Sequence, residues 1–174
     1  MTELALSRFQ GRLYRALNPV YAREPLSGRG AALYGGRLNP KGTAALYTAL
    51  DPLTALREAN QVGDLQPTTL VAYRADLHPV FDTRDEAALR DQGLTPDQLA
   101  DSGWRKAMLE GHPVPTQDFA QRLIGAGYVG CLVRSFAPGA VGASLNLVLW
   151  RWNTAADDHL AVIDEENRLG RLLN

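Results

Sequence analysis

Three side chains that could do chemistry follow one another at nearly even spacing. Arg37, Tyr47 and Glu58 are separated by ten and eleven positions and offer a cation, an aromatic face and a carboxylate. The segment that carries them, residues 28–58, begins as a glycine-rich loop, continues into a short strand and ends in a capped helix. A guanidinium binds phosphate through paired hydrogen bonds, and an aromatic face stacks on a planar ring. The three together predict a pocket for an anionic, ring-bearing nucleotide.

The elements that must position these residues alternate between strand and helix patterns. Strands are predicted at residues 11–17, 44–50, 68–75, 128–134 and 145–152, with a short strand or strand end at 80–82. Helices are predicted at 52–62, within 83–111 and at 117–126. Strands thus come early and late, with helices inserted between them. This order predicts a single α+β domain over residues 1–174, with a mostly antiparallel sheet that brings the N-terminal and C-terminal strands together.

Local signals set the expected limits of these elements. Asp51 is the predicted N-cap of the helix that carries Glu58, with Pro52 at its first position. Thr95 with Gln98 matches a capping box, and Thr116 is the predicted cap of the next helix. Residues 22–43 are rich in glycine and proline and predict a long, ordered loop. The acidic tail, residues 157–166, is expected to be a solvated surface or a fraying helix.

Composition excludes several classes of protein. The chain has 174 residues, 45% of them hydrophobic, and a formal net charge of -1, which argues against direct binding of nucleic acid through clustered basic residues. One cysteine, Cys131, rules out an intrachain disulfide, and its apolar surroundings predict a core thiol. No apolar run approaches the roughly 18 residues of a membrane span, and the N-terminus has no signal-peptide pattern. We therefore expect a cytoplasmic protein without a membrane anchor.

Known catalytic motifs are also missing. The three histidines are isolated, without a second histidine or a cysteine at ligand spacing, so no metal site is expected. Lys41-Gly42-Thr43 has the wrong order for a phosphate loop, and the chain has no Gly-x-Ser-x-Gly nucleophile elbow.

An ordered set of residues resembles the RES-domain toxin family, which is named after an arginine, a glutamate and a serine. The set comprises Arg15, the run Tyr34-Gly-Gly-Arg37-x-Asn39-Pro40-x-Gly42, Tyr47, Glu58, a late Gly-x-x-x-x-Ser135 and the strand Asn146–Trp150. The resemblance implies a core similar to that of mono-ADP-ribosyltransferases. It also implies the toxin half of a bacterial toxin–antitoxin pair that breaks NAD at the nicotinamide–ribose bond. The partner would be a helix-turn-helix (Xre-like) antitoxin whose C-terminal region blocks the active site.

The residues themselves agree with that chemistry. Nicotinamide leaves NAD as a neutral molecule, so no acid has to protonate it, and a single carboxylate is enough where a glycosidase commonly needs two. Glu58 would stabilise the positive charge that develops on the ribose. Arg37 would bind the diphosphate, and Arg15 would bind the same phosphates or the acceptor. Tyr47 would offer a ring to nicotinamide.

The remaining candidates are substrate-binding residues, and several functions stay open. Tyr34 would offer a second ring, Asn39 would fix the loop or a ribose, and Ser135 would hydrogen-bond ribose or phosphate. Taken singly, each candidate also has an ordinary structural interpretation as a surface, core or turn residue. The acceptor of ADP-ribose is phosphate in the preferred hypothesis, with water or a host protein as alternatives. A non-catalytic nucleotide-binding module is a further alternative.

Two departures from the family pattern affect different parts of the expected site, the first the stacking beside the base and the second the acceptor. Leu38 stands where the family commonly has an aromatic residue, and Ala137 stands where a basic residue often follows the serine. The second departure leaves open whether phosphate or a protein takes the ADP-ribose.

Overall fold

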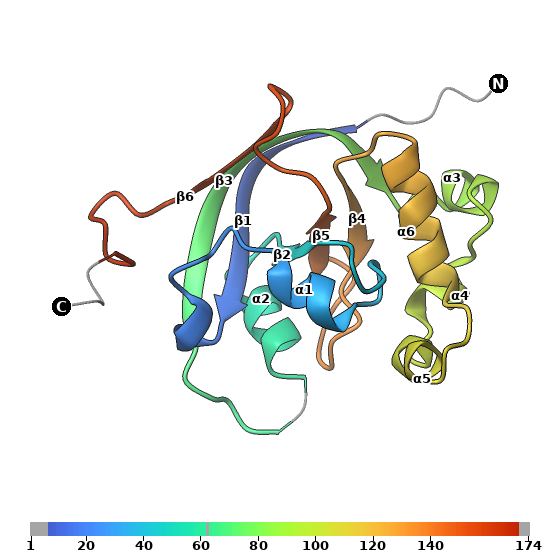
Figure 1. Cartoon of the computed structure of the whole chain (residues 1–174), viewed down its shortest axis with the longest axis horizontal. Coiled ribbons are helices and arrows are strands. Elements are labelled where there is room, and N and C mark those ends of the chain that lie inside the picture. The colour runs from blue at the N-terminus through green and yellow to red at the C-terminus, as the bar shows by residue number, and fades with distance from the viewer. Residues whose placement is uncertain (1–6, 62, 171–174) are drawn as a thin grey trace.

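The computed structural model describes residues 7–61 and 63–170, which form a curved sheet flanked by short helices (Figure 1). Its strands are β1 (Ser7–Leu17), β2 (Leu46–Ala49), β3 (Thr69–Asp82), β4 (Gly130–Arg134), β5 (Leu145–Leu149) and β6 (Asp158–Val162). Its helices are the 3-10 helix η1 (Pro19–Tyr21), α1 (Arg29–Tyr34), α2 (Pro52–Ala59), α3 (Glu86–Asp91), α4 (Pro96–Ala100), α5 (Trp104–Leu109) and α6 (Pro115–Gly125).

The strands are ordered β1-β2-β5-β4-β3-β6, and β1 also pairs with β3. The five strands β1, β2, β5, β4 and β3 therefore close into a ring, and the sixth strand, β6, pairs with β3. Every pairing is antiparallel except that of β3 with β4. The α+β class, the mostly antiparallel sheet and the helices inserted between early and late strands are confirmed, since α3–α6 lie between β3 and β4 in the chain.

The two predicted segments at 68–75 and 80–82 form one strand. The alternate burial of Val71, Tyr73, Ala75 and Leu77 stops at His78–Pro79, after which Val80 and Phe81 are both buried. β1 pairs with β3 along most of its length, from Leu17 opposite Thr69 to Ser7 opposite Val80, with a shift in register between Phe9 and Ser7. Pairing resumes at Val80, and between the two segments the His78 N–H donates to the Asp157 carbonyl and the Pro79 carbonyl accepts from the Val129 N–H.

Two predictions of irregular structure are wrong in part. The predicted loop at 22–43 contains the helix α1, which ends at Gly35 in a conformation with φ of 70°. The predicted solvated tail contains β6, where Asp158 is fully buried. Its carboxylate accepts hydrogen bonds from the hydroxyl and backbone N–H of Thr154 and from the N–H of Ala155, at 2.6–2.9 Å. Pairing with β3, a contact far away in sequence, makes this acidic segment a strand.

The predicted caps are confirmed for two helices and wrong for a third. The Asp51 side chain accepts from the Thr54 N–H at the start of α2, and Thr95 with Gln98 forms the capping box of α4. Helix α2 ends at Ala59, before the predicted end at Val62, which lies outside the described residues. Thr116 does not cap α6, because the helix begins at Pro115 and the Thr116 hydroxyl donates to the backbone oxygen of Arg37 instead.

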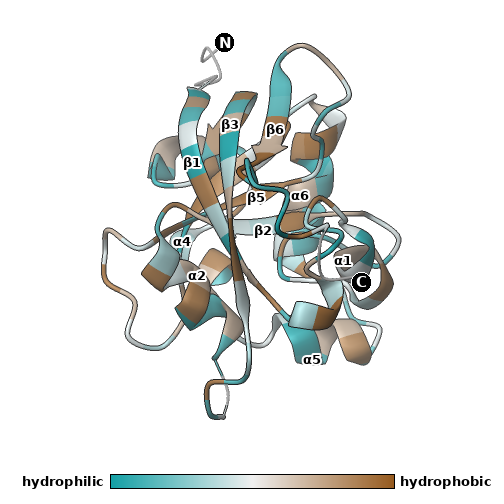
Figure 2. Cartoon of the chain, turned by 90° about the vertical axis from the view of Figure 1, so that its left-hand side faces the viewer, coloured by the Kyte–Doolittle hydropathy of each residue, from teal (hydrophilic) through white to brown (hydrophobic). Residues whose placement is uncertain are grey.

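Buried hydrophobic side chains form two core clusters. Figure 2 shows that hydrophobic residues are spread along the strands and helices that contribute to them. One core, between the sheet and α3–α6, contains Phe81, whose ring lies edge-on to those of Phe119 and Tyr128 at 5.6 and 5.5 Å. Cys131 is fully buried in this core, and burial raises the pKa of its thiol, which confirms the predicted core thiol. None of the described helices is long and apolar enough to span a bilayer.

Candidate active site

Glu58 reaches the centre of the molecule because of how α2 packs. Thr54 and Ala55 are buried on one face of this helix, and Glu58 lies three to four positions further along the same face. The Asp51 cap fixes where the helix starts, since its carboxylate accepts both the backbone N–H and the hydroxyl of Thr54. Glu58 therefore lies on the inward face of α2.

Three side chains hold the Glu58 carboxylate. One oxygen accepts hydrogen bonds from the Ser135 hydroxyl and the Asn146 amide, each at 2.5 Å, and the other accepts from the Gln61 amide at 2.6 Å. Hydrogen bonds to a charged group are stronger than those between neutral groups. Donors just after α2, on β5 and just after β4 thus fix the orientation of one half-buried acid.

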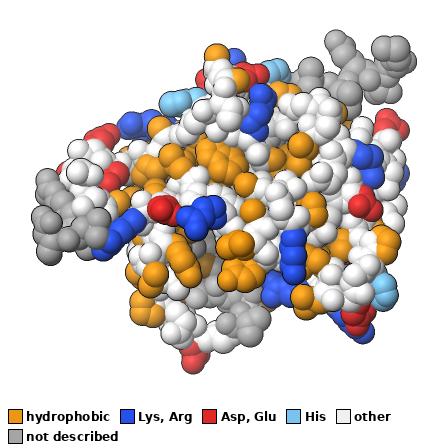
Figure 3. All heavy atoms as spheres, in the orientation of Figure 1, with side chains coloured by type: hydrophobic (Ala, Val, Ile, Leu, Met, Phe, Trp, Pro, Cys, Tyr) orange, Lys and Arg blue, Asp and Glu red, His pale blue; other side chains and the backbone are white. Residues whose placement is uncertain are grey.

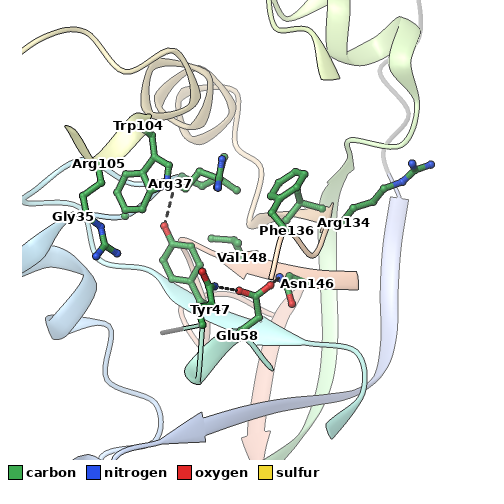
Figure 4. Close-up of a pocket in the computed structure, with 14 residues that line it drawn as sticks. Gly35, Arg37, Tyr47, Glu58, Trp104, Arg105, Arg134, Phe136, Asn146 and Val148 are labelled. Atoms are coloured by element: carbon green, nitrogen blue, oxygen red, sulfur yellow. Dashed lines mark hydrogen bonds between the residues drawn. The ribbon is translucent and has the colours of Figure 1, made fainter. Parts of the chain in front are cut away.

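The sheet delivers Tyr47 and Asn146 to the same face as Glu58. Tyr47 on β2 lies opposite Val148 on β5, and Asn146 lies opposite Val133 on β4. Side chains two residues apart on a strand share a face, so Asn146 and Val148 point the same way. Figure 4 shows Glu58 between Tyr47 and Asn146, with Val148 behind them.

The Tyr47 hydroxyl ties down the glycine loop. It donates to Asn39 Oδ1 at 2.6 Å and accepts from the Leu38 N–H at 3.1 Å. Gly36 permits this contact, because a Cβ there would lie under 3 Å from both the Tyr47 hydroxyl and Asn39 Oδ1. Burial of the hydroxyl raises the pKa of Tyr47, so it stays protonated in neutral solution. The ring is 38% exposed and remains available to a ligand.

Asn39 supports the loop from inside the protein. It is fully buried, and its amide donates to the backbone oxygens of Ala31 and Thr43 at 2.9 Å each. All of its strong hydrogen bonds are made within the protein. Of the two roles predicted for Asn39, the structure places it to fix the loop.

Arg37 links the glycine loop to the inserted helices. Its guanidinium donates to the backbone oxygens of Leu99 and Asp101 at 2.9 and 2.7 Å, and lies 4.7 Å from the centre of the Phe136 ring. Burial lowers the pKa of Arg37 and the nearby Glu58 carboxylate opposes that shift, yet arginine stays charged in proteins. Its remaining donors can reach an anion in the cleft.

Glu58 lies where two hollows meet. The larger lobe, of about 300 Å³, is lined on its outer side by Arg37, Trp104, Arg105 and Phe136. The smaller lobe, of about 210 Å³, is lined by Tyr14, Arg15, Ala16, Thr48, Ala49, Ala55 and Ala59. Tyr47, Glu58 and Asn146 line both lobes. The cleft is of the size that binds small molecules, roughly 300–1,000 Å³.

The cleft gathers most of the candidates from the sequence and leaves Tyr34 and Asn39 outside. Arg37, Tyr47, Glu58 and Arg15 line one or both lobes, and Ser135 holds the carboxylate from behind. Tyr34 lies elsewhere: it is 74% exposed at the end of α1 and lines a separate groove. Figure 3 shows hydrophobic side chains gathered on the face of the molecule that is turned toward the viewer in Figure 1, where α1 lies. Tyr34 does not reach Glu58's cleft, because α1 turns it outward.

Sequence reasoning missed several residues of the cleft. Asn146 was noted only as part of a family strand, although a polar residue in an apolar strand could have marked it. Trp104, Arg105 and Phe136 lie in segments without a recognisable motif, so only the fold brings them to the larger lobe. Arg134 also borders this lobe, but Figure 4 shows its side chain extending away from Glu58.

The arrangement can bind an anionic molecule and stabilise positive charge at one point. Arg37 supplies a cation beside the single carboxylate, whereas the Arg15 guanidinium donates to the Pro25 carbonyl at 2.9 Å, on the face of β1 opposite to Tyr14. Within residues 7–61 and 63–170, no group of three or more His, Cys, Asp or Glu side chains could hold a metal ion. The fold and cleft thus define an α+β protein with one fixed carboxylate in a two-lobed, cation-bordered pocket.

Comparison with known proteins identifies the family. The RES domain model matches residues 12–170, so the chain belongs to the RES domain family, as the sequence resemblance suggested. No curated protein sequence matches the chain. The fold is similar to that of a chain in the crystal structure of the M. tuberculosis MbcT–MbcA toxin–antitoxin complex. That match has a TM-score of 0.62 and 20% identity, and it covers 90% of this chain and 83% of the other.

Proposed function

We propose that this protein is the toxin of a bacterial toxin–antitoxin pair and degrades NAD by cleaving the nicotinamide–ribose bond. The observation that carries the proposal is the placement of Glu58. Its carboxylate lies at the junction of two lobes, held by three donors, with the Tyr47 ring beside it and Arg37 and Arg105 bordering the larger lobe. A dinucleotide has two ring-bearing halves joined by a diphosphate, and this shape and charge suit it.

The chemistry needs one fixed negative charge. When the bond between the ribose carbon C1′ and the nicotinamide nitrogen breaks, the electron pair leaves with nicotinamide, which becomes neutral. Positive charge then develops on the ribose, and Glu58 would stabilise it while accepting hydrogen bonds from the ribose hydroxyls. A single preorganised group of this kind supplies about 3–4 kcal/mol of transition-state stabilisation. Ser135 and Asn146 would keep the carboxylate oriented.

Phosphate is the acceptor we prefer. An oxygen of inorganic phosphate would bond to C1′ and give ADP-ribose-1-phosphate, while water would give ADP-ribose. Ala137 stands where the family often has a basic residue, and Arg105, which lines the larger lobe, would supply a cation for phosphate. NAD and phosphate are thus the proposed substrates, and no metal takes part.

The test is to incubate the protein with NAD, with and without phosphate, and to identify the products by mass spectrometry. Nicotinamide together with ADP-ribose-1-phosphate supports the proposal and names phosphate as the acceptor. Transfer of label from NAD into one protein band of a host lysate supports a mono-ADP-ribosyltransferase instead. Complete recovery of intact NAD rejects catalysis and leaves a nucleotide-binding module.

A helix-turn-helix antitoxin is the proposed partner. The support is the family, together with a similar fold that was solved within a toxin–antitoxin complex. We expect the C-terminal region of that antitoxin to cover the cleft. Co-expression with the small protein encoded next to this chain should abolish NAD loss, and unchanged NAD loss would contradict the pairing.

A further inference from the structure

The three tryptophans of the chain differ in one respect. The indole N–H of Trp150 donates to the Leu38 carbonyl at 2.8 Å, and that of Trp152 donates to the Leu26 carbonyl at 3.1 Å. Both are therefore bonded within the protein. In the described part of the chain, the indole N–H of Trp104 has no such acceptor, and the half-buried ring lines the larger lobe. A ligand in the cleft would find both a ring face and a donor.

Trp104 is held firmly in place. It begins α5, three residues after Asp101, whose backbone oxygen accepts from Arg37 and whose side chain accepts from the Gly103 N–H. At the other end of α5, Met108 packs on the glycine loop so closely that a Cβ at Gly35 would lie under 3 Å from its sulfur. The inserted helices therefore form a fixed wall of the cleft, with Trp104 facing inward (Figure 4).

Charge around Trp104 discriminates between the two halves of NAD. The Arg105 guanidinium lies 5.1 Å from the centre of the indole ring, and Arg37 borders the same lobe. Two cations repel the positively charged nicotinamide ring, whereas they attract the diphosphate and tolerate neutral adenine. The smaller lobe, of about 210 Å³, is lined by four alanines and by Tyr14 and Tyr47, and the guanidinium of Arg15 beside it donates to the Pro25 carbonyl.

Resting on the proposed function, we infer that Trp104 is a specificity-determining residue that stacks on the adenine of the dinucleotide in the larger lobe. The smaller lobe is then left for nicotinamide, and the C1′–nitrogen bond lies at the junction, beside Glu58. In this arrangement α5 selects an adenine dinucleotide over a mononucleotide, while Glu58 acts on either.

The test compares NAD with nicotinamide mononucleotide as substrates. The mononucleotide keeps the bond that is cleaved and lacks the AMP half of NAD. Base stacking on an aromatic ring contributes enough that Trp104→Ala should raise the KM for NAD by about 5- to 150-fold. The KM for the mononucleotide should change by less than about twofold. Trp104→Phe keeps a stacking ring and should restore most of the affinity for NAD. Leu109→Ala, an exposed position on the same helix, is the matched control and should change neither substrate.

A binding measurement separates this inference from the proposed function. Calorimetry should show that AMP binds the unmodified protein. Trp104→Ala should raise the Kd for AMP by the same factor as it raises the KM for NAD. Nicotinamide should bind both proteins equally. Two results would overturn the inference and leave the proposed function standing, provided that NAD is consumed. In the first, Trp104→Ala raises the KM for NAD and for the mononucleotide by the same factor. In the second, Trp104→Ala weakens the binding of nicotinamide and leaves the binding of AMP unchanged. If NAD stays intact, the function fails and the AMP measurement still decides the role of Trp104.

Discussion

Replacing Tyr47 by phenylalanine separates two roles that the structure assigns to one side chain. The ring faces the cleft, whereas the hydroxyl ties the glycine loop through Asn39 and the Leu38 N–H. Phenylalanine keeps the ring and removes the tie. We therefore expect Tyr47→Phe to lose stability and to keep most of its catalytic activity.

The size of the loss follows from the groups left behind. Asn39 and Leu38 are 0% and 1% exposed, so the variant leaves one buried acceptor and one buried donor without the partner they have now. An unsatisfied buried group costs about 1–3 kcal/mol, so the two groups together cost about 2–6 kcal/mol. For a chain of this length, the midpoint of thermal unfolding should fall by about 4–24 °C.

Two measurements check this prediction. Thermal unfolding followed by circular dichroism gives the stability, with Tyr21→Phe as the control, since that tyrosine is 68% exposed and should change by less than about 0.5 kcal/mol. A double-mutant cycle with Asn39→Ala should show a coupling of about 1 kcal/mol or more. Below its unfolding temperature, Tyr47→Phe should keep a KM for NAD within about threefold of the unmodified protein.

Either of two results would refute the reasoning about Tyr47. An unchanged unfolding midpoint would mean that the hydroxyl does not hold the loop. A folded variant whose turnover falls more than about 100-fold at an unchanged KM would mean that the hydroxyl acts on the reacting atoms.

Three further predictions follow from the geometry. Gly36→Ala should destabilise the protein by about 1–3 kcal/mol in urea unfolding, because the new Cβ meets Tyr47 and Asn39. Gly30→Ala, with open space around it, should not destabilise the protein. Equal unfolding midpoints for the two variants would contradict the packing around Gly36. Asn146→Ala removes a donor to the carboxylate and should lower kcat/KM by about 10- to 100-fold in a nicotinamide-release assay, and an unchanged rate would exclude a positioning role. Hydrogen bonds from Arg8 and Gln10 lower the pKa of Asp76 to about 2, so its contribution to stability is present above pH 4 and is lost as the pH falls toward 2. Asp76→Asn should therefore reduce the difference between unfolding midpoints at pH 7 and pH 3, and an undiminished difference would contradict this assignment.

Local sequence signals predicted the parts of the site that depend on neighbours in the chain. Asp51 and Pro52 set the start of α2, and helical spacing from Thr54 and Ala55 turns Glu58 inward. The glycine loop was recognised by composition, although the helix within it was not. These features are decided within a few residues, where capping and turn rules apply.

Contacts between distant segments decided what could not be predicted. Asn146 and Ser135 meet Glu58 only because β4 and β5 pair in register beside α2. Trp104 reaches the cleft because backbone oxygens before α5 bind Arg37, a contact across more than sixty residues. Tyr34 was assigned to the site from its place in the motif, but the turn of α1 directs it outward. β6 could not be predicted either, because this segment forms a strand by pairing with β3, which is distant in the sequence.

The rate of nicotinamide release from NAD by the unmodified protein and by Glu58→Gln tests the central claim most directly. The variant keeps the size of the side chain and loses its charge. We predict that kcat falls by about 10²- to 10³-fold, while NAD still binds with an affinity within a few-fold, and that Glu165→Gln at an exposed position keeps the full rate. A Glu58→Gln protein that releases nicotinamide at the unmodified rate would contradict the account.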